Sequence, residues 1–107
     1  MIALGCDHGG FELMQEVKKH LESKGLAYQD FGCRGTDPVD YPDYAAEVAR
    51  AIQGGTCDRG ILICGTGIGI SEAVNKVPGA RCALVRDMTS ALFARRHLGA
   101  NVCGFGG

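Results

Sequence analysis

The 107-residue sequence lacks an excess of charge of either sign, since 11 Lys and Arg face 12 Asp and Glu. Surfaces for nucleic acids or anionic membranes need a basic excess, so neither partner is expected. Long hydrophobic runs are also missing, because the longest apolar runs are only as long as strands. The first residues, Met1–Gly5, lack the charged flank of a secretion signal. We expect one cytoplasmic domain over residues 1–107.

Paired cysteines of the kind that bind zinc are absent as well. The six cysteines stand at 6, 33, 57, 64, 82 and 103, and no two form a C-x-x-C pair. We therefore expect no metal. Cys6, Cys82 and Cys103 lie in apolar, strand-like segments and are interpreted as small buried hydrophobic residues. Cys33 and Cys57 lie in polar loops and carry no functional signal.

Several phosphate-binding motifs are missing. The phosphatase loop needs an arginine six positions after its cysteine, and Ile70 stands there; a Walker Gly-Lys-Ser/Thr is absent. The dinucleotide fingerprint is a closer alternative. Gly65-x-Gly67-x-Gly69 opens a helix and Asp87 follows about 20 residues later, but the third glycine comes one residue early. A nucleotide- or dinucleotide-binding module is thus the alternative from the binding class.

What the sequence does contain is a regular alternation of apolar strands and helices. Strands are expected at Ile2–Cys6, Leu26–Phe31, the run that ends at Cys64, Arg81–Arg86 and Ala100–Phe105. Helices are expected from Phe11 to Gly25, from Pro42 to Gly54, from Gly69 to Lys76 and from Met88 to Leu98. Repeated β-α units predict an α/β fold, a three-layer, doubly wound, Rossmann-like sheet of five parallel strands flanked by helices.

The segment Gly60–Ser71 is the most informative part of the chain. A buried apolar strand leads into Cys64, and the glycine-rich turn Gly65–Gly69 then opens a helix. Glycines let backbone N–H groups approach a ligand closely, and the helix N-terminus favours negative charge. Such surroundings favour the thiolate form of a cysteine. Cys64, with an open face towards solvent, is therefore a candidate base or nucleophile.

A second polar loop, Asp7-His8-Gly9-Gly10, follows the first strand. If the first and third strands are neighbours, this loop faces the Cys64 turn where ligands bind in doubly wound sheets. Two interpretations stay open, because Asp7 and His8 either bind substrate or serve only as a helix cap and a solvated residue. Tyr41 either covers the crevice or anchors its loop. His97 ends the last helix, where histidine is often only a dipole partner.

A family resemblance rests on five segments together. They are Asp7-His8-Gly9-Gly10, Asp40-Tyr41-Pro42, Gly60–Ser71, Asn75-Lys76 and the spacing from His97 to Asn101-Val102. In these segments the chain resembles the ribose 5-phosphate isomerase type B family, which includes the galactose 6-phosphate isomerase subunits.

The resemblance implies an aldose–ketose isomerase for phosphorylated sugars. It also implies no metal or cofactor, and a homodimer or higher homo-oligomer with its sites at the subunit interface. By this analogy His97 opens the sugar ring and Cys64 moves a proton between C1 and C2. The amides of Gly65, Gly67 and Gly69 and the Thr66 hydroxyl stabilise the enediolate, and substrate is bound by Asp7, His8, Tyr41 and Asn101.

The sequence departs from the family pattern in two ways. Leu98 follows the histidine, where the family usually has an asparagine that contacts substrate, so the preferred sugar is open. Family chains also continue beyond the last strand with a helix and phosphate-binding arginines, whereas this sequence ends at Gly107. From the residues given we expect weak or no turnover by this form alone, and an inactive assembly protein is a further alternative.

Overall fold

The computed structural model describes residues 1–107 and contains one parallel sheet of five strands in the order β2-β1-β3-β5-β4. The strands are β1 (Ile2–Cys6), β2 (Tyr28–Asp30), β3 (Arg59–Cys64), β4 (Cys82–Leu84) and β5 (Val102–Gly106). The helices are α1 (Phe11–Ser23), α2 (Tyr41–Gln53), α3 (Ile68–Asn75) and α4 (Met88–Arg96). The predicted α/β fold is confirmed.

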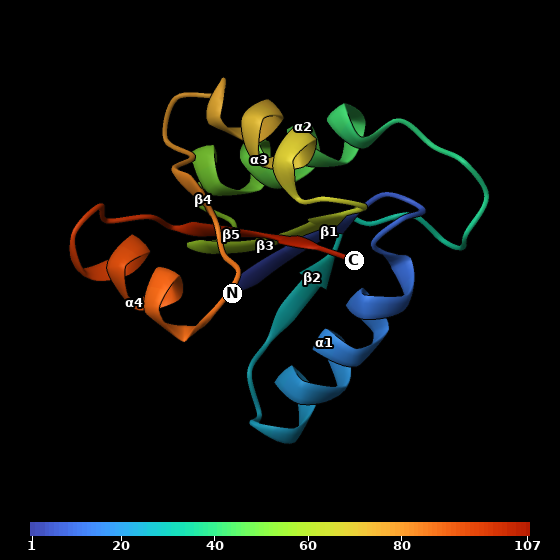
Figure 1. Ribbon diagram of the computed structural model, residues 1–107, viewed down its shortest axis with the longest axis horizontal. Coiled ribbons are helices and arrows are strands. Elements are labelled where there is room, and N and C mark those ends of the chain that lie inside the picture. The colour runs from blue at the N-terminus through green and yellow to red at the C-terminus, as the bar shows by residue number, and fades with distance from the viewer.

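The helices form two outer layers around the sheet. Helices α2 and α3 cover one face, and α1 and α4 lie on the opposite face (Figure 1). The chain adds β2 on one side of β1 and β3 on the other, so the direction of winding reverses between β1 and β3. In doubly wound sheets this reversal opens a crevice beyond the carboxyl ends of the strands.

The core consists of one apolar layer on each face of the sheet. Alternate residues of β3 supply both layers, since side chains alternate along a strand. Leu62 packs with Val48 of α2 and Val74 of α3, whereas Ile63 packs with Met14 of α1. All five of these side chains are fully buried. Strand β3 therefore ties the two layers together at the centre of the molecule.

The expected elements differ from the observed ones mainly at the sheet edges. Strands β2 and β4 hold only three residues each, although Leu26–Phe31 and Arg81–Arg86 were expected. An edge strand has a hydrogen-bonded neighbour on one side only. Its terminal residues can therefore lie outside the sheet, even where they are apolar, without the loss of hydrogen bonds to a second strand. Helix α4 ends at Arg96, and His97 is its C-cap. None of the helices has both the length and the apolarity to cross a membrane.

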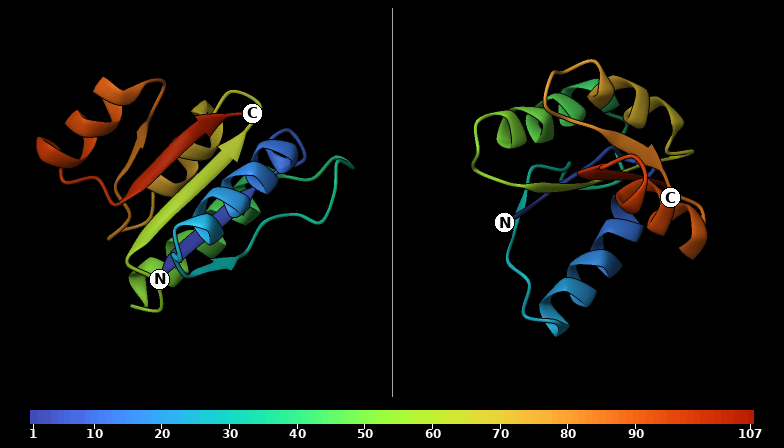
Figure 2. Two further views of the ribbon diagram at one scale, coloured as in Figure 1. Left: turned by 90° about the horizontal axis from the view of Figure 1, so that it is seen from below. Right: turned by 90° about the vertical axis from the view of Figure 1, so that its left-hand side faces the viewer.

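The α1/α4 face of the sheet is only partly covered. Helices α1 and α4 stand apart, and the ribbon of β3 and β5 is visible between them (Figure 2). Apolar side chains are exposed on and just after α4, with exposed fractions of 74% for Met88, 56% for Phe93 and 60% for Leu98. Exposed apolar groups gathered in one region indicate an interaction surface.

The central position of β3 gives a test of the core. Leu62→Ala should lower the free energy of unfolding by about 2–5 kcal/mol, because a fully buried leucine leaves a cavity between two packed layers. Leu13→Ala is the matched control, since Leu13 is 37% exposed on α1. Urea unfolding followed by circular dichroism measures both. Equal destabilisation by the two variants would contradict this description of the core.

Candidate active site

The carboxyl ends of β1, β3 and β5 bring the two predicted polar loops together. The Asp7 amide donates to the Ile63 carbonyl at 3.2 Å, and the Gly107 amide donates to the Cys64 carbonyl at 2.7 Å. Strands β1 and β3 are hydrogen-bonded neighbours, which was the condition for the two loops to face each other. The Asp7–Gly10 loop and the Cys64–Gly69 turn therefore share one edge of the sheet.

Glycine is required where the two loops touch. A Cβ on Gly9 would lie 2.9 Å from the Gly65 nitrogen, and a Cβ on Gly10 would lie 2.3 Å from the Ile63 carbonyl oxygen. Both distances are to backbone atoms, which cannot rotate out of the way. Any larger residue would push the loops apart, so these glycines set the width of the crevice.

Cys64 ends β3 with its side chain towards the α2/α3 layer. Its Sγ accepts a hydrogen bond from the Gly67 amide at 3.2 Å. The residue is 5% exposed, which corrects the expectation of an open face. Gly65 and Thr66, which follow it, are exposed, so the open part of the site lies over the turn. The Gly67 amide is thus a backbone donor directed at this sulfur.

Ser71 holds the turn in place, and sequence analysis did not single it out. Gly67 adopts a left-handed conformation with φ of 78°. The buried Ser71 hydroxyl donates to the Gly67 carbonyl at 2.6 Å, and the Ser71 amide donates to the same oxygen at 3.2 Å. This pair of bonds fixes the Gly67–Ile68 peptide group, which directly follows the Gly67 nitrogen that donates to Cys64. In the sequence, only its hydroxyl and its position four residues after a glycine at the start of a helix mark Ser71.

Asp7 is buried, with 6% of its surface exposed, and is occupied by its own loop. One carboxylate oxygen, Oδ1, accepts from the Gly9 amide at 2.9 Å and from the Gly10 amide at 3.2 Å. A carboxylate can accept further hydrogen bonds at its second oxygen. Asp7 thus stabilises its own loop rather than capping α1, whose N-cap is Gly10, and it still has acceptor capacity for a ligand hydroxyl.

His8 is fixed in one tautomer. Its Nδ1 accepts a hydrogen bond from the Val39 amide at 3.1 Å. The neutral imidazole therefore carries its proton on Nε2, which can donate to a ligand. This contact also ties His8 to the connection between β2 and α2. His8 is half-buried, so it is fixed without being enclosed.

Tyr41 and Thr66 complete the same edge. A Cβ on Gly69 would lie 2.7 Å from the ring of Tyr41, so the first residue of α2 packs against the first turn of α3. Tyr41 is 38% exposed at that contact. The exposed Thr66 hydroxyl accepts from the Ile68 amide at 3.1 Å. Its own proton is therefore free to be donated to a ligand.

His97 and Asn101 lie at the other end of the sheet. Both belong to the connection from α4 to β5, and the Asn101 carbonyl accepts from the amide of Gly60 near the start of β3. Cys64 lies four positions after Gly60 in β3, a distance of about 13 Å along a strand. His97 is exposed and stacks on Phe93 with ring centroids 4.5 Å apart. One chain does not bring His97 to Cys64.

The side chain of Asn101 is used within its own chain. Its Oδ1 accepts from the Arg81 amide at 2.8 Å, and its Nδ2 donates to the Gly79 carbonyl at 2.9 Å. These bonds join the loop before β4 to the start of β5. A ligand at Asn101 would have to compete with them or use the remaining lone pairs of the amide oxygen.

Asp87, the acid of the dinucleotide alternative, is used as a helix cap. Its carboxylate accepts from the Ser90 amide at 2.7 Å, and this hydrogen bond lowers the pKa of Asp87. It follows the edge strand β4, and β5 separates that strand from β3. The dinucleotide fingerprint needs its acid beside the glycine loop. The geometry therefore favours plain capping.

The other cysteines differ from Cys64. Burial raises the pKa of Cys82 to about 11 and also raises the pKa of Cys103, which keeps both as thiols. Cys82 and Cys103 were expected to be buried but are only half-buried, whereas Cys6 is buried as expected. Cys33 and Cys57, expected in polar loops, are both buried. No backbone amide donates to the sulfur of Cys33, Cys57, Cys82 or Cys103.

Comparisons with known proteins point to one family. The family described as Ribose/Galactose Isomerase matches residues 2–107. Ribose-5-phosphate isomerase B of Escherichia coli is 48% identical over 105 residues, which cover 98% of this chain and 70% of that protein. Galactose-6-phosphate isomerase subunit LacB of Clostridium acetobutylicum is 39% identical over 107 residues, covering 100% and 62%. The solved structure of Clostridium thermocellum ribose-5-phosphate isomerase B superimposes with a TM-score of 0.96 at 48% identity, covering 98% and 71%.

The two hydrogen bonds of Asp7 separate its structural role from any role in binding. Asp7→Ala should lower the free energy of unfolding by about 1–3 kcal/mol, because two amide groups lose their acceptor. Asp7→Asn should cost less than half as much, since an amide oxygen can accept the same bonds. Denaturant unfolding measures both variants. Equal loss in the two would show that the carboxylate charge, rather than an acceptor oxygen, stabilises the loop.

Proposed function

The chain belongs to the ribose/galactose isomerase family and is a sugar-phosphate isomerase, and from its site we propose that it interconverts ribose 5-phosphate and ribulose 5-phosphate. The observation that carries this proposal is the contact at Cys64. Its Sγ accepts the Gly67 amide hydrogen at 3.2 Å, at the edge where the Asp7–His8 loop meets the glycine turn.

Cys64 is the base in the proposed reaction. Isomerisation of an aldose requires removal of the proton on C2, next to the C1 carbonyl, which gives an enediolate. Return of that proton to C1 gives the ketose, so the step needs one group that accepts a proton and returns it. A thiolate stabilised by the Gly67 amide can do both. Cys33, Cys57, Cys82 and Cys103 lack an amide donor to their sulfur, and burial raises the pKa of Cys6 to about 12.

The turn after Cys64 is suited to the charge that develops on the substrate oxygens. The proposal assigns stabilisation of the enediolate to the amides of Gly65 and Gly69 and to the Thr66 hydroxyl, whereas the Gly67 amide is directed at the Cys64 sulfur. The turn is held before substrate arrives, because Ser71 binds the Gly67 carbonyl. Preorganised donors of this kind are each worth about 2.7–4 kcal/mol of the barrier.

Asp7, His8 and Tyr41 are the proposed substrate contacts from the same edge. The second oxygen of Asp7 can accept from a sugar hydroxyl, and the Nε2–H of His8 can donate to an oxygen of the substrate. Tyr41 packs on Gly69, where its ring borders the turn. In the proposed complex, these groups contact the substrate on the side that faces away from the Cys64 sulfur.

Ring opening needs an acid and a base near the anomeric oxygen, and the proposal gives this role to His97. Because His97 and Asn101 lie at the opposite end of the sheet from Cys64, one chain cannot supply both groups to one substrate. A second copy can supply them in a homodimer. The apolar side chains exposed near His97, including Phe93 and Leu98, are consistent with an interface there.

Removal of the Cys64 thiol tests the proposed base. Cys64→Ala should slow the interconversion of ribose 5-phosphate and ribulose 5-phosphate by about 10²–10⁴-fold, the usual contribution of a general base. Cys57→Ala is the matched control, because Cys57 is also buried but precedes β3 at the opposite end of the strand. Turnover of Cys64→Ala within a few-fold of the unaltered protein, with both variants folded by circular dichroism, would reject this role.

A mixing experiment tests whether two copies share the site. Cys64→Ala and His97→Ala should each be inactive, but the isolated mixed dimer should regain about half of the original activity, because one of its two sites is intact. Coexpression with two different tags allows the mixed dimer to be isolated and assayed. A mixed dimer as inactive as each parent would show that Cys64 and His97 act within one chain, and an active His97→Ala parent would show that His97 has no role.

A further inference from the structure

Two cysteines outside the proposed site lie in contact. Cys6 ends β1 and Cys33 lies in the connection between β2 and α2. Their Sγ atoms are 3.9 Å apart, and no other pair of cysteine sulfurs in residues 1–107 makes such a contact. Both residues are buried, with 1% of Cys6 and 7% of Cys33 exposed.

The backbone already places Cys33 beside Cys6, one residue beyond Gly32, which the β1–β2 register sets opposite Cys6. The Phe31 amide donates to the Leu4 carbonyl at 2.8 Å, and the Cys33 amide donates to the Cys6 carbonyl at 3.2 Å. This pattern continues the β1–β2 ladder beyond the last residue of β2. Neighbouring strands are about 4.8 Å apart, and a disulfide needs Cα atoms between about 4.4 and 6.8 Å apart.

We propose that Cys6 and Cys33 form an intramolecular disulfide when the protein meets a peroxide. The pair is then an oxidation site separate from Cys64. The bond requires the two sulfurs to approach from 3.9 Å to about 2.05 Å. Rotation of the side chains can supply most of this movement. Gly32 leaves the space free, because a Cβ at that position would lie 2.9 Å from the Cys6 sulfur.

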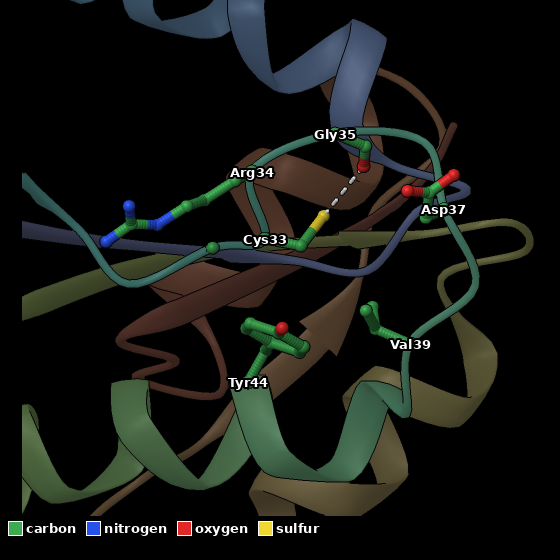
Figure 3. Close-up of a pocket in the computed structure, with 7 residues that line it drawn as sticks. Cys33, Arg34, Gly35, Asp37, Val39 and Tyr44 are labelled. Atoms are coloured by element: carbon green, nitrogen blue, oxygen red, sulfur yellow. Dashed lines mark hydrogen bonds between the residues drawn. The ribbon is translucent and has the colours of Figure 1, made fainter.

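An oxidant can reach one member of the pair. Cys33 lines a cavity of about 510 Å³ together with residues of the same connection and Tyr44 of α2 (Figure 3). Its thiol points towards the Gly35 carbonyl, 3.3 Å away. Cys6 lies behind it, at the end of β1. Peroxide therefore meets Cys33 first, and Cys6 acts as the second thiol.

The protonation of Cys6 fits this order. Burial, followed by the neighbouring Cys33, raises the pKa of Cys6 to about 12. A thiol with such a pKa reacts poorly with peroxide, because the thiolate is the nucleophile. Cys33 is thus the residue that is oxidised first, and the buried Cys6 is kept as a thiol until its neighbour has reacted.

The two steps balance. In the first, the Cys33 sulfur attacks one oxygen of hydrogen peroxide, the O–O bond breaks, and water leaves as Cys33 becomes a sulfenic acid. In the second, the Cys6 sulfur attacks the Cys33 sulfur, the S–O bond breaks, and hydroxide leaves with the Cys6 proton as a second water. Two thiols lose two electrons in total, and one peroxide gains them.

Oxidation of this pair is expected to act on the Asp7–His8 loop. Cys6 directly precedes Asp7, and the Val39 amide of the Cys33 connection donates to Nδ1 of His8. Drawing Cys33 towards Cys6 changes the position of both segments. This effect on turnover rests on the proposed function, whereas formation of the disulfide does not.

Peptide mapping tests the bond without any need for turnover. The protein is treated with hydrogen peroxide, blocked with iodoacetamide and digested with trypsin without reduction. Cleavage at Lys18 and Lys24 separates the two cysteines, so a disulfide joins two peptides with a mass about 2 Da below their sum. We expect the joined peptides in the unaltered protein and in Cys103→Ser, the control. They should be absent from Cys33→Ser.

Other results would overturn the proposal. These are Cys6 recovered only as the alkylated thiol after peroxide, Cys6 joined to a different cysteine, or joined peptides absent from the unaltered protein. In the activity measurement, the unaltered protein should lose turnover at peroxide concentrations that Cys33→Ser withstands, because both retain Cys64. Joined peptides with identical peroxide sensitivity in the two proteins would contradict the coupling to the site and not the disulfide.

Discussion

The site depends on the close approach of two backbone turns at the carboxyl edge of the sheet. Gly9 and Gly10 lie against the Gly65 and Ile63 backbones at separations that exclude any side chain. This approach puts the Asp7–His8 loop beside the donors that follow Cys64. The left-handed Gly67, held by Ser71, directs one of those donors to the sulfur. Without these glycines, the same polar residues would be present but separated.

Much of the fold followed from the sequence, because burial on both sides makes parallel strands apolar and helices amphipathic. The edge strands were predicted too long, because the length of an edge strand depends on its pairing with one neighbour and not on its amino-acid composition. The facing of the Asp7 and Cys64 loops also followed, from the topology of doubly wound sheets. Long-range contacts could not be predicted in this way. The burial of Cys33 against Cys6, 27 residues away, depends on where the β2–α2 connection folds back.

The position of His97 shows the same limit more sharply. Sequence pattern placed it at a helix end but could not assign that end to an edge of the sheet. In the structure His97 and Asn101 lie at the start of β5, whereas Cys64 lies at the end of β3. A single chain therefore holds these residues at opposite ends of one sheet. In the proposed homodimer, the Cys64 end of one chain meets the His97 end of the other. Each site then contains both the proposed base and the proposed ring-opening histidine, so the reaction requires assembly.

The most direct measurement is a crystal structure of the protein with a phosphorylated hydroxamate, a planar mimic of the enediolate. The account predicts that the hydroxamate oxygens lie within about 3 Å of the amides of the Gly65–Gly69 turn, with the Cys64 sulfur over the carbon that loses its proton. It also predicts a histidine of a second copy near the ligand. A ligand bound away from Cys64, for example in the cavity beside Cys33, would contradict the account.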